Sequence, residues 1–252
     1  MSEITYVGPN RLLGSLSDDD FELLSGQLSP VSLTQLEPLE VANEVPNRVY
    51  FPEGGVASVV ATLRNQKNFE VGLIGWEGMT GTSILCGAPS PFDCYVQFVG
   101  PALSMPTHKL VDALNASQTL RTAMNLYAHV LSVQTAYTAL ASAHAPLAER
   151  LARWLMMIDD RVDGPEFNVT HALLSIMLGV RRAGVTSALH ELEGEGLIRS
   201  TRGRVAIIHR PGLRSRAGNA YGKSEKSYDE LVEAVDPSLI TLKLRNKKFH
   251  AV

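Results

Sequence analysis

The stretch from Thr170 to Ile198 constrains the fold of this chain more than any other, because it reads as two helices joined by a tight turn. Gly179 is expected to end the first helix and Gly196 the second, since glycine adopts the left-handed conformation cheaply. Thr170 is placed to cap the first helix. Apolar residues recur at helical spacing on one face of each helix, at Ala172, Leu173, Ile176, Met177 and Leu178 and then at Val185, Ala188, Leu189 and Leu192. This pattern is typical of a helix-turn-helix, and spacing alone fits any pair of packed helices equally well.

The sequence that follows decides between these alternatives. Leu197 to Ile208 reads as a strand, a turn and a second strand, with Arg202 and Arg204 flanking Gly203 in the turn. This is the pattern of a basic wing. A helix-turn-helix followed by a basic wing is much more specific for DNA binding than either part alone.

The distribution of charge supports the same interpretation. The chain has a formal net charge of −3, yet residues 168–216 carry eight Lys or Arg against three Asp or Glu. Residues 1–117 carry five against thirteen. Phosphate contacts supply much of the affinity for DNA, so we expect the basic segment to be the DNA-binding part.

A family resemblance follows from these residues. The segment MLGVRRAGVTSALHELEGEGLIRSTRGRVAI resembles the winged-helix module of the cyclic-AMP receptor and fumarate–nitrate regulator (Crp/Fnr) superfamily of bacterial transcription regulators. Upstream, NRLLGSLSDDDFELL resembles the family's opening helix, and RVYFPEGGVASVVATL the first strands of its sensory roll. The resemblance covers roughly Asn10 to Leu213 and implies a homodimer that binds double-stranded DNA.

Glycine-punctuated short strands up to about Met105, followed by a long helical pattern, predict an α+β chain. We expect four parts. Residues 1–116 form a cupin-like sensory β-roll (jelly roll) of the cyclic-nucleotide-binding type, and 117–145 form a dimerisation helix. Residues 146–216 form the winged helix-turn-helix, and 217–252 form a C-terminal tail with a short helix near Tyr228.

The long helix has a heptad-like series of residues spaced by three and four. One interpretation is a helix packed on its own roll. The family resemblance favours the other, a seam that pairs with a second copy, made of Leu120, Met124, Tyr127, Leu131, Gln134 and Thr138.

Residues early in the second helix of the motif are expected to face the major groove. The resemblance aligns Arg182 with the family's base-reading arginine, and a guanidinium can bond guanine in two places. Ala183 stands where the family often has glutamate, which makes the family's usual operator uncertain here. We predict that Arg182, Thr186 and Ser187 read bases, and that Arg181, His190, Arg202 and Arg204 lie near phosphates.

In the roll, the turn from Gly75 to Gly81 faintly resembles the family's cyclic-phosphate turn, so Gly75, Glu77, Gly78, Met79 and Thr80 are candidate effector-binding residues. The family's arginine is missing, and residues 68–107 contain no Lys, Arg or His. An unpaired buried phosphate is costly. We therefore expect cyclic AMP to bind weakly or not at all, and the roll to bind an unknown small molecule or nothing.

No cofactor or metal is expected. An iron–sulfur cluster needs about four cysteines, and the chain has only Cys86 and Cys94. Both read as buried small hydrophobes, with oxidant sensing as the alternative. His108 and His129 are isolated and predict no haem ligand.

An enzyme is not expected, because the roll has no histidine before His108 to ligate a cupin metal, and no hydrolase elbow or phosphate-binding loop is present. The alternatives are a winged-helix protein-interaction module or a ligand-binding cupin-like protein without specific DNA readout. No signal segment or long apolar run is apparent, so we expect a cytoplasmic protein that does not bind membranes. RNA polymerase is a further candidate partner.

Overall fold

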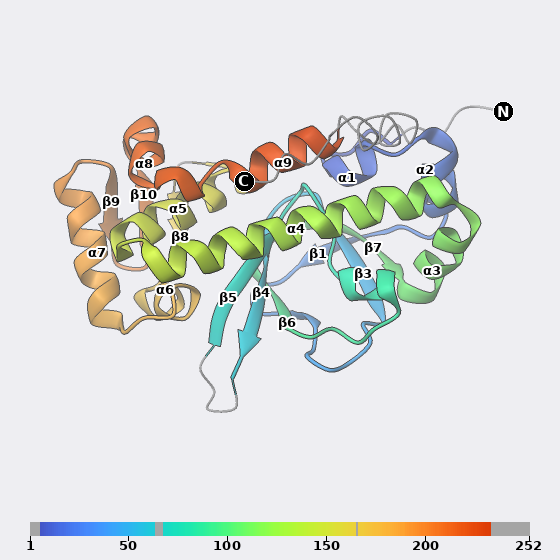
Figure 1. Ribbon diagram of the computed structural model, residues 1–252, viewed down its shortest axis with the longest axis horizontal. Helices are drawn as coiled ribbons and strands as arrows, with labels where there is room; N and C mark the ends of the chain where they lie inside the picture. The colour runs from blue at the N-terminus through green and yellow to red at the C-terminus, as the bar shows by residue number, and fades with distance from the viewer. Residues whose placement is uncertain (1–5, 64–67, 165, 233–252) are drawn as a thin grey trace, which may run out of the picture.

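The fold is organised along one long helix. The computed structural model describes residues 6–63, 68–164 and 166–232. Helix α4 (Gln118–His144) runs the length of the molecule, with a β-roll against one side and a winged helix-turn-helix at its C-terminal end (Figure 1). This mixed arrangement of a β-sheet N-terminal part, a long helix and a C-terminal helix-turn-helix confirms the predicted fold class.

The β-roll consists of two antiparallel sheets. One sheet has the order β1-β7-β3 and the other β2-β6-β4-β5. Hairpin β4–β5 has the alternating, valine-rich pattern that favours a half-buried strand. Side chains facing inward from both sheets, among them Leu33, Ala57, Ile74 and Val96, fill the space between them. The strands are β1 (Ser29–Leu33), β2 (Pro38–Glu40), β3 (Arg48–Pro52), β4 (Val56–Thr62), β5 (Asn68–Ile74), β6 (Asp93–Phe98) and β7 (Gly100–Pro106).

Short helices close the end of the roll that is remote from the winged helix. They are α1 (Arg11–Gly14), α2 (Asp18–Ser25), the 3-10 helix η1 (Thr82–Cys86) and α3 (Thr107–Ala116). Ser17 caps α2, because its hydroxyl accepts a hydrogen bond from the Asp20 amide. Three aspartates fill the first turn of α2, where the helix dipole favours negative charge.

Helix α4 begins at a serine cap and ends before a proline. The Ser117 hydroxyl accepts a hydrogen bond from the Leu120 amide at its start. Ala145 is extended before Pro146, which cannot continue a helix. Helix α5 (Leu147–Asp159) follows at once and is buried along most of its length, so it joins the roll to the winged helix.

The winged helix consists of α6 (His171–Met177), α7 (Arg182–Gly194), α8 (Arg210–Arg216) and a three-stranded sheet of order β8-β10-β9. Strands β9 (Ile198–Thr201) and β10 (Arg204–Ile207) are the predicted wing. Strand β8 (Glu166–Asn168) was not predicted. It pairs with β10, which lies more than thirty residues later in the sequence, and no local sequence pattern predicts this pairing.

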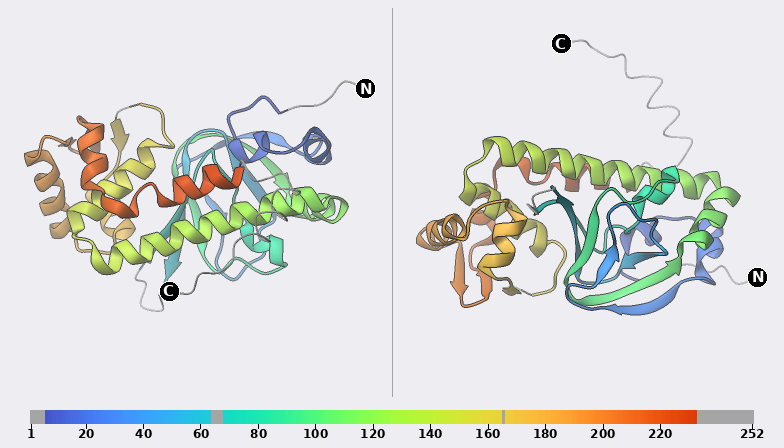
Figure 2. Two further views of the ribbon diagram at one scale, coloured as in Figure 1. Left: turned by 45° about the horizontal axis from the view of Figure 1, so that its top comes forward. Right: turned by 90° about the horizontal axis from the view of Figure 1, so that it is seen from below.

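The stretch expected as a tail from residue 217 contains a 3-10 helix η2 (Gly218–Ala220) and helix α9 (Lys223–Val232). Helix α9 folds back and packs along α4, as both views of its length show (Figures 1 and 2). The basic end of the chain, residues 237–252, lies outside the described residues.

Among the described residues, no single helix is long and apolar enough to cross a membrane. Helices α6 and α7 reach such a length and composition only when they are taken together, and they meet at a sharp bend.

Candidate DNA-binding surface

The helix-turn-helix has the geometry that groove binding needs. Helices α6 and α7 meet at 101° across a four-residue turn, within the range of this motif. The Thr170 hydroxyl accepts a hydrogen bond from the Leu173 amide, and Gly179 takes a φ of +63°. Both predicted end signals are therefore confirmed. Of the predicted apolar face of α6, Ile176 differs, since it is 38% exposed.

One face of α7 is buried and the opposite face is open. Val185, Ala188, Leu189 and Leu192 are buried in the core of the winged helix, as predicted. The open face starts at Arg181, which caps the helix without a side-chain bond. The predicted contact residues of this helix all lie on or beside that face, with Arg181, Arg182, Ala183, Ser187 and His190 exposed and Thr186 half-buried.

Two hydroxyls on this face already have partners. The Ser187 hydroxyl donates to the Ala183 carbonyl over 3.2 Å, and Thr186 Oγ1 lies 3.1 Å from His171 Nδ1. A hydroxyl bonded to its own helix can still accept a hydrogen bond from a base. Thr186 is held in place by two contacts, the second to the Arg182 carbonyl, so His171 is a supporting residue that the sequence did not suggest.

The acidic residues of the basic segment are all engaged away from the open face. Glu191 and Glu195 both pair with Arg216 on α8. Glu193 accepts a hydrogen bond from the Ser200 amide at 2.5 Å. These contacts tie the C-terminal half of α7 to α8 and to the wing. The N-terminal half of α7 carries no acidic side chain, and its exposed polar side chains are cationic or hydroxyl-bearing.

The wing carries further cations. Gly203 takes a φ of +76° in the turn between β9 and β10, and Arg202 beside it is exposed. Arg204 lies 3.6 Å from Glu166 on β8, an exposed pair that is easily exchanged for a phosphate contact. Arg199 on β9 is also exposed and was missed, because its position before the turn gave no signal distinct from an ordinary strand residue.

Gly184 has a packing role. A Cβ added there would lie 3.1 Å from the Leu147 side chain of α5. The glycine thus lets α7 approach α5 closely, which is a sufficient reason for a residue that otherwise weakens the helix.

The predicted dimer seam on α4 faces the protomer itself. Leu120, Met124 and Tyr127 are buried in the core that also holds Met79 and Met105. Gln134 accepts from the Leu73 amide at 2.6 Å and donates to the Leu73 carbonyl, and Leu131 and Thr138 are half-buried. The alternative interpretation, a helix packed on its own roll, therefore describes the four buried residues, Leu120, Met124, Tyr127 and Gln134. The open face of α4 includes Val133, Ala136 and Leu140, of which Leu140 is 51% exposed.

The five candidate effector residues lie in a closed turn. Met79 and Thr80 are fully buried, and Thr80 accepts a hydrogen bond from the Tyr50 amide. A Cβ at Gly78 would meet the Tyr127 ring at about 2 Å, so the ring covers the turn. Gly75 lies beneath Arg161. Glu77 alone of the five lines a pocket, where it pairs with Arg161 from the end of α5 at 2.9 Å.

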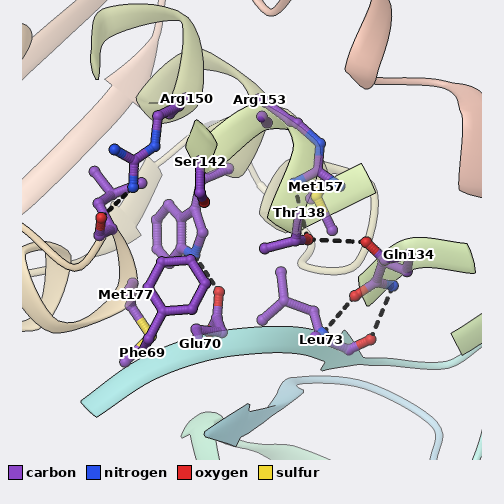
Figure 3. A pocket seen from close by; sticks show the side chains of 14 residues that line it. Phe69, Glu70, Leu73, Gln134, Thr138, Ser142, Arg150, Arg153, Met157 and Met177 are labelled. Carbon is purple, nitrogen blue, oxygen red and sulfur yellow. Dashed lines mark hydrogen bonds between the residues drawn. The ribbon is translucent and has the colours of Figure 1, made fainter. Parts of the chain in front are cut away.

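A second set of contacts joins the roll to the winged helix at α5. Figure 3 shows Glu70 and Leu73 of β5 facing α4 and α5, with Gln134, Arg150 and Met177 around them. Glu70 is buried, and its carboxylate accepts a hydrogen bond from the Trp154 indole at 2.7 Å. Burial raises the pKa of Glu70 to about 8, against the lowering effect of its bonds to Ser58 and Trp154. The Arg150 guanidinium donates to the Leu178 carbonyl at the end of α6.

The cysteines differ from each other. Cys94 is buried, as predicted, and burial raises the pKa of its thiol well above the usual value. The prediction for Cys86 is wrong, because this residue lies in the exposed end of η1, where its Sγ lies 3.1 Å from the Ser83 carbonyl. His108 and His129 are exposed. Within the described residues, no three His, Cys, Asp or Glu side chains gather as a metal site would require.

Comparison with known proteins agrees with this geometry. Residues 149–216 match the family model of the Crp-like helix-turn-helix domain. No curated protein sequence matches the chain. FixK2 from Bradyrhizobium japonicum is similar in structure, with a TM-score of 0.65 at 14% identity over 75% of this chain and 96% of that one.

Two proteins from Thermus thermophilus are similar as well. TTHA1359, a transcriptional regulator of the CRP/FNR family, has a TM-score of 0.63 at 19% identity, covering 76% of this chain and all of the other. TTHB099, a transcriptional regulator of the CRP family, has a TM-score of 0.62 at 17% identity, covering 75% and 97%. This chain therefore has the fold of the Crp/Fnr regulators and carries a Crp-like helix-turn-helix domain at residues 149–216.

Proposed function

We propose that this protein is a sequence-specific DNA-binding transcriptional regulator that acts as a homodimer on an inverted-repeat operator. The N-terminal half of α7 enters the major groove, where Arg182, Thr186 and Ser187 read base edges. Arg181, His190 and the wing arginines Arg202 and Arg204 contact phosphates. The matched domain and the fold support a DNA-binding regulator, and the finer roles follow from where these side chains lie.

One observation carries the proposal. In the basic segment, residues 168–216, the acidic side chains are paired and several arginines are not. All three of its acidic side chains are bonded to Arg216 or Ser200, while Arg181, Arg182 and Arg202 form no ion pair with any described residue. Unpaired cations of this kind can replace the counterions of a phosphate backbone, so the separation favours a DNA-binding surface.

The test is selection of bound sequences from a random DNA pool with the purified protein at two salt concentrations. We expect an inverted repeat whose half-sites lie about 34 Å apart, because two recognition helices then enter successive major grooves. The affinity should fall steeply with salt. A variant with Arg181 and Arg182 both changed to glutamine should select nothing, while Arg121→Gln, at the far end of α4, should select the same site. Selection that is unaffected by the double variant would contradict the proposal.

The homodimer is proposed to form on the open face of α4, around Leu140. Leu140→Glu should convert the dimer into a monomer in sedimentation equilibrium, because a charge would replace an apolar side chain at the centre of the seam. Val99→Glu is the matched control, since Val99 is similarly exposed, at 62%, but lies on the roll. A monomeric parent protein, or a Leu140→Glu variant that remains dimeric, would contradict this seam.

For the roll, we propose that cyclic AMP binds weakly or not at all at the turn from Gly75 to Thr80. The Tyr127 ring covers the turn. Of the cations beside it, Arg161 is paired with Glu77 and Arg11 lies over the Trp76 ring. A calorimetric titration that gave a micromolar dissociation constant, lost on changing Thr80, would contradict this part.

A further inference from the structure

A pocket of about 570 Å³ lies between the roll, α4, the end of α5, α8 and the C-terminal extension. Its volume is within the range of small-molecule sites in proteins. It lies outside the roll's interior and outside the DNA-binding face. Its walls come from six segments of the chain, from Arg11 to Lys226, and α9 lies along α4 at one side (Figure 1).

The walls are rich in basic side chains. Five of them line the pocket, against two carboxylates, Glu77 and Asp160. Most of these cations are already paired, Arg161 with Glu77, Arg210 with Asp159 and Asp160, and Lys226 with Glu230. The positive charge that a molecule in the pocket can pair with is therefore that of Arg214. The basic residues are Arg11, Arg161, Arg210, Arg214 and Lys226.

The rest of the lining is aromatic and aliphatic. Trp76 and Tyr221 contribute rings from the two sides, and Arg11 and Arg214 lie over those rings, 5.6 and 5.8 Å from their centroids. Leu73, Val130 and Leu131 form the floor on the side of the roll and α4. Aromatic rings beside cations suit a ligand that carries both a planar ring and a negative group.

We propose that this pocket binds an organic anion that bears a planar ring. The anionic group pairs with the guanidinium of Arg214 and its cationic neighbours, and the ring lies against Trp76, Tyr221 and Leu131. No carboxylate among the described residues pairs with Arg214, so its charge is available to the ligand.

The pocket lies between the roll and the winged helix, so a bound ligand can affect how these two parts are placed. Trp76 and Glu77 belong to the roll, whereas Arg210 and Arg214 belong to α8 of the winged helix. A ligand that contacts both sides changes the free energy of their relative placement by its differential affinity for each arrangement. This consequence, unlike the binding itself, rests on the proposed function in DNA binding. Cyclic AMP has the right charge and a ring, but we expect it to bind weakly because the Tyr127 ring covers the roll's turn at Gly78.

The experiment is calorimetric titration of the full chain, without DNA, with anilinonaphthalene sulfonate as the probe and its uncharged parent phenylnaphthylamine as the matched ligand. We expect one sulfonate per chain, bound at least about tenfold more tightly than the uncharged parent, since a bond to a charged group contributes about 1.5–3 kcal/mol. Because DNA is absent, a failure here is independent of whether the proposed DNA binding holds.

Variants place the site. Arg214→Gln removes the cation, and Leu131→Trp fills the floor, so each should weaken the sulfonate at least about tenfold. Arg121→Gln loses the same charge outside the pocket and should bind as the parent protein does. Far-ultraviolet circular dichroism confirms that each variant is folded. Saturable binding that falls in both pocket variants and not in the control supports the proposal.

Two results would overturn it. The first is binding that is absent, unsaturable or equal in all variants. The second is a parent protein that excludes the probe as a dimer and admits it only as a monomer, in the Leu140→Glu variant. In that case a second copy of the chain, and not a small anion, occupies the pocket.

Discussion

The arginines at the junction of the roll and the winged helix differ from those on the DNA-binding face. At the junction, Arg161 is buried against Glu77, and Arg210 bonds both Asp159 and Asp160. On the DNA-binding face, Arg182 and Arg202 are exposed and pair with no described carboxylate. The same side chain thus fixes the arrangement of the parts in one region and is held ready for an external anion in the other. The difference lies in burial and in the placement of acids.

The largest test of this comparison is Arg161→Gln. Arg161 is buried and the Glu77 side chain is only 14% exposed, so removing one leaves a poorly compensated charge, and the free energy of unfolding should fall by about 3 kcal/mol. Denaturant unfolding measures it. The double variant with Glu77→Gln should lose less than the two single variants added together. A loss below about 1 kcal/mol would place Arg161 with the exposed arginines instead.

The next effect concerns Glu70, the buried carboxyl between the two regions. Its pKa is near 4.5 in the unfolded chain and about 8 in the folded protein. Between these values the folded protein holds a proton that the unfolded chain has released, so the free energy of unfolding falls as pH rises, and the loss is complete above about pH 8. The total is a few kcal/mol. Glu70→Gln should flatten this dependence, as urea unfolding at several pH values can measure.

An unchanged slope in Glu70→Gln would assign the pH dependence to other groups. Glu40 is the natural control, because burial also raises the pKa of this carboxyl, but it lies within the roll and bonds the Gly81 amide. Glu40→Gln should leave the contribution of Glu70 in place.

On the DNA-binding face, Arg182→Ala should reduce affinity by about 1–3 kcal/mol at one base position, since a guanidinium that bonds two atoms of guanine is lost. The free energy of unfolding should change by less than about 0.5 kcal/mol, in contrast to Arg161. Competition binding against operators mutated at single positions measures the first, and denaturant unfolding the second. An equal loss for every operator would make Arg182 a phosphate contact.

The smallest effect is expected at the wing. Arg202→Gln should lower the slope of log affinity against log salt by about 0.9, the value for one phosphate contact, and leave sequence preference unchanged. Fluorescence anisotropy with the operator at four salt concentrations measures the slope. If the preferred sequence changed instead, the wing would read bases.

The parts that could be predicted from the sequence are those with local signals. The caps at Ser17, Ser117 and Thr170 and the turn at Gly179 depend on neighbours three or four residues away. The apolar stripe of α7 and the basic turn of the wing are likewise periodic or adjacent in sequence. These signals were sufficient for the fold class and for which segment holds the candidate DNA-binding surface.

The parts that could not be predicted depend on pairing between distant segments. The absence of Lys, Arg and His from residues 68–107 suggested that the roll's turn has no positive charge nearby. Arg161, which is 84 residues after Glu77 in the sequence, nevertheless bonds that carboxylate. The heptad-like series on α4 marks a buried face, but periodicity does not say whether the roll or a second copy buries it. The same holds for α9, whose helical pattern gives no indication that it packs on α4.

The two tryptophans of the chain both bond across the junction of the roll and α5. The Trp76 indole, on the roll, donates to the Asp160 carbonyl at 3.0 Å, and the Trp154 indole, on α5, donates to Glu70 of the roll. The protein therefore contains its own optical reporter of that junction. A rotation of the winged helix against the roll would break both bonds and change the intrinsic tryptophan emission, with no label attached and no other indole to dilute the signal.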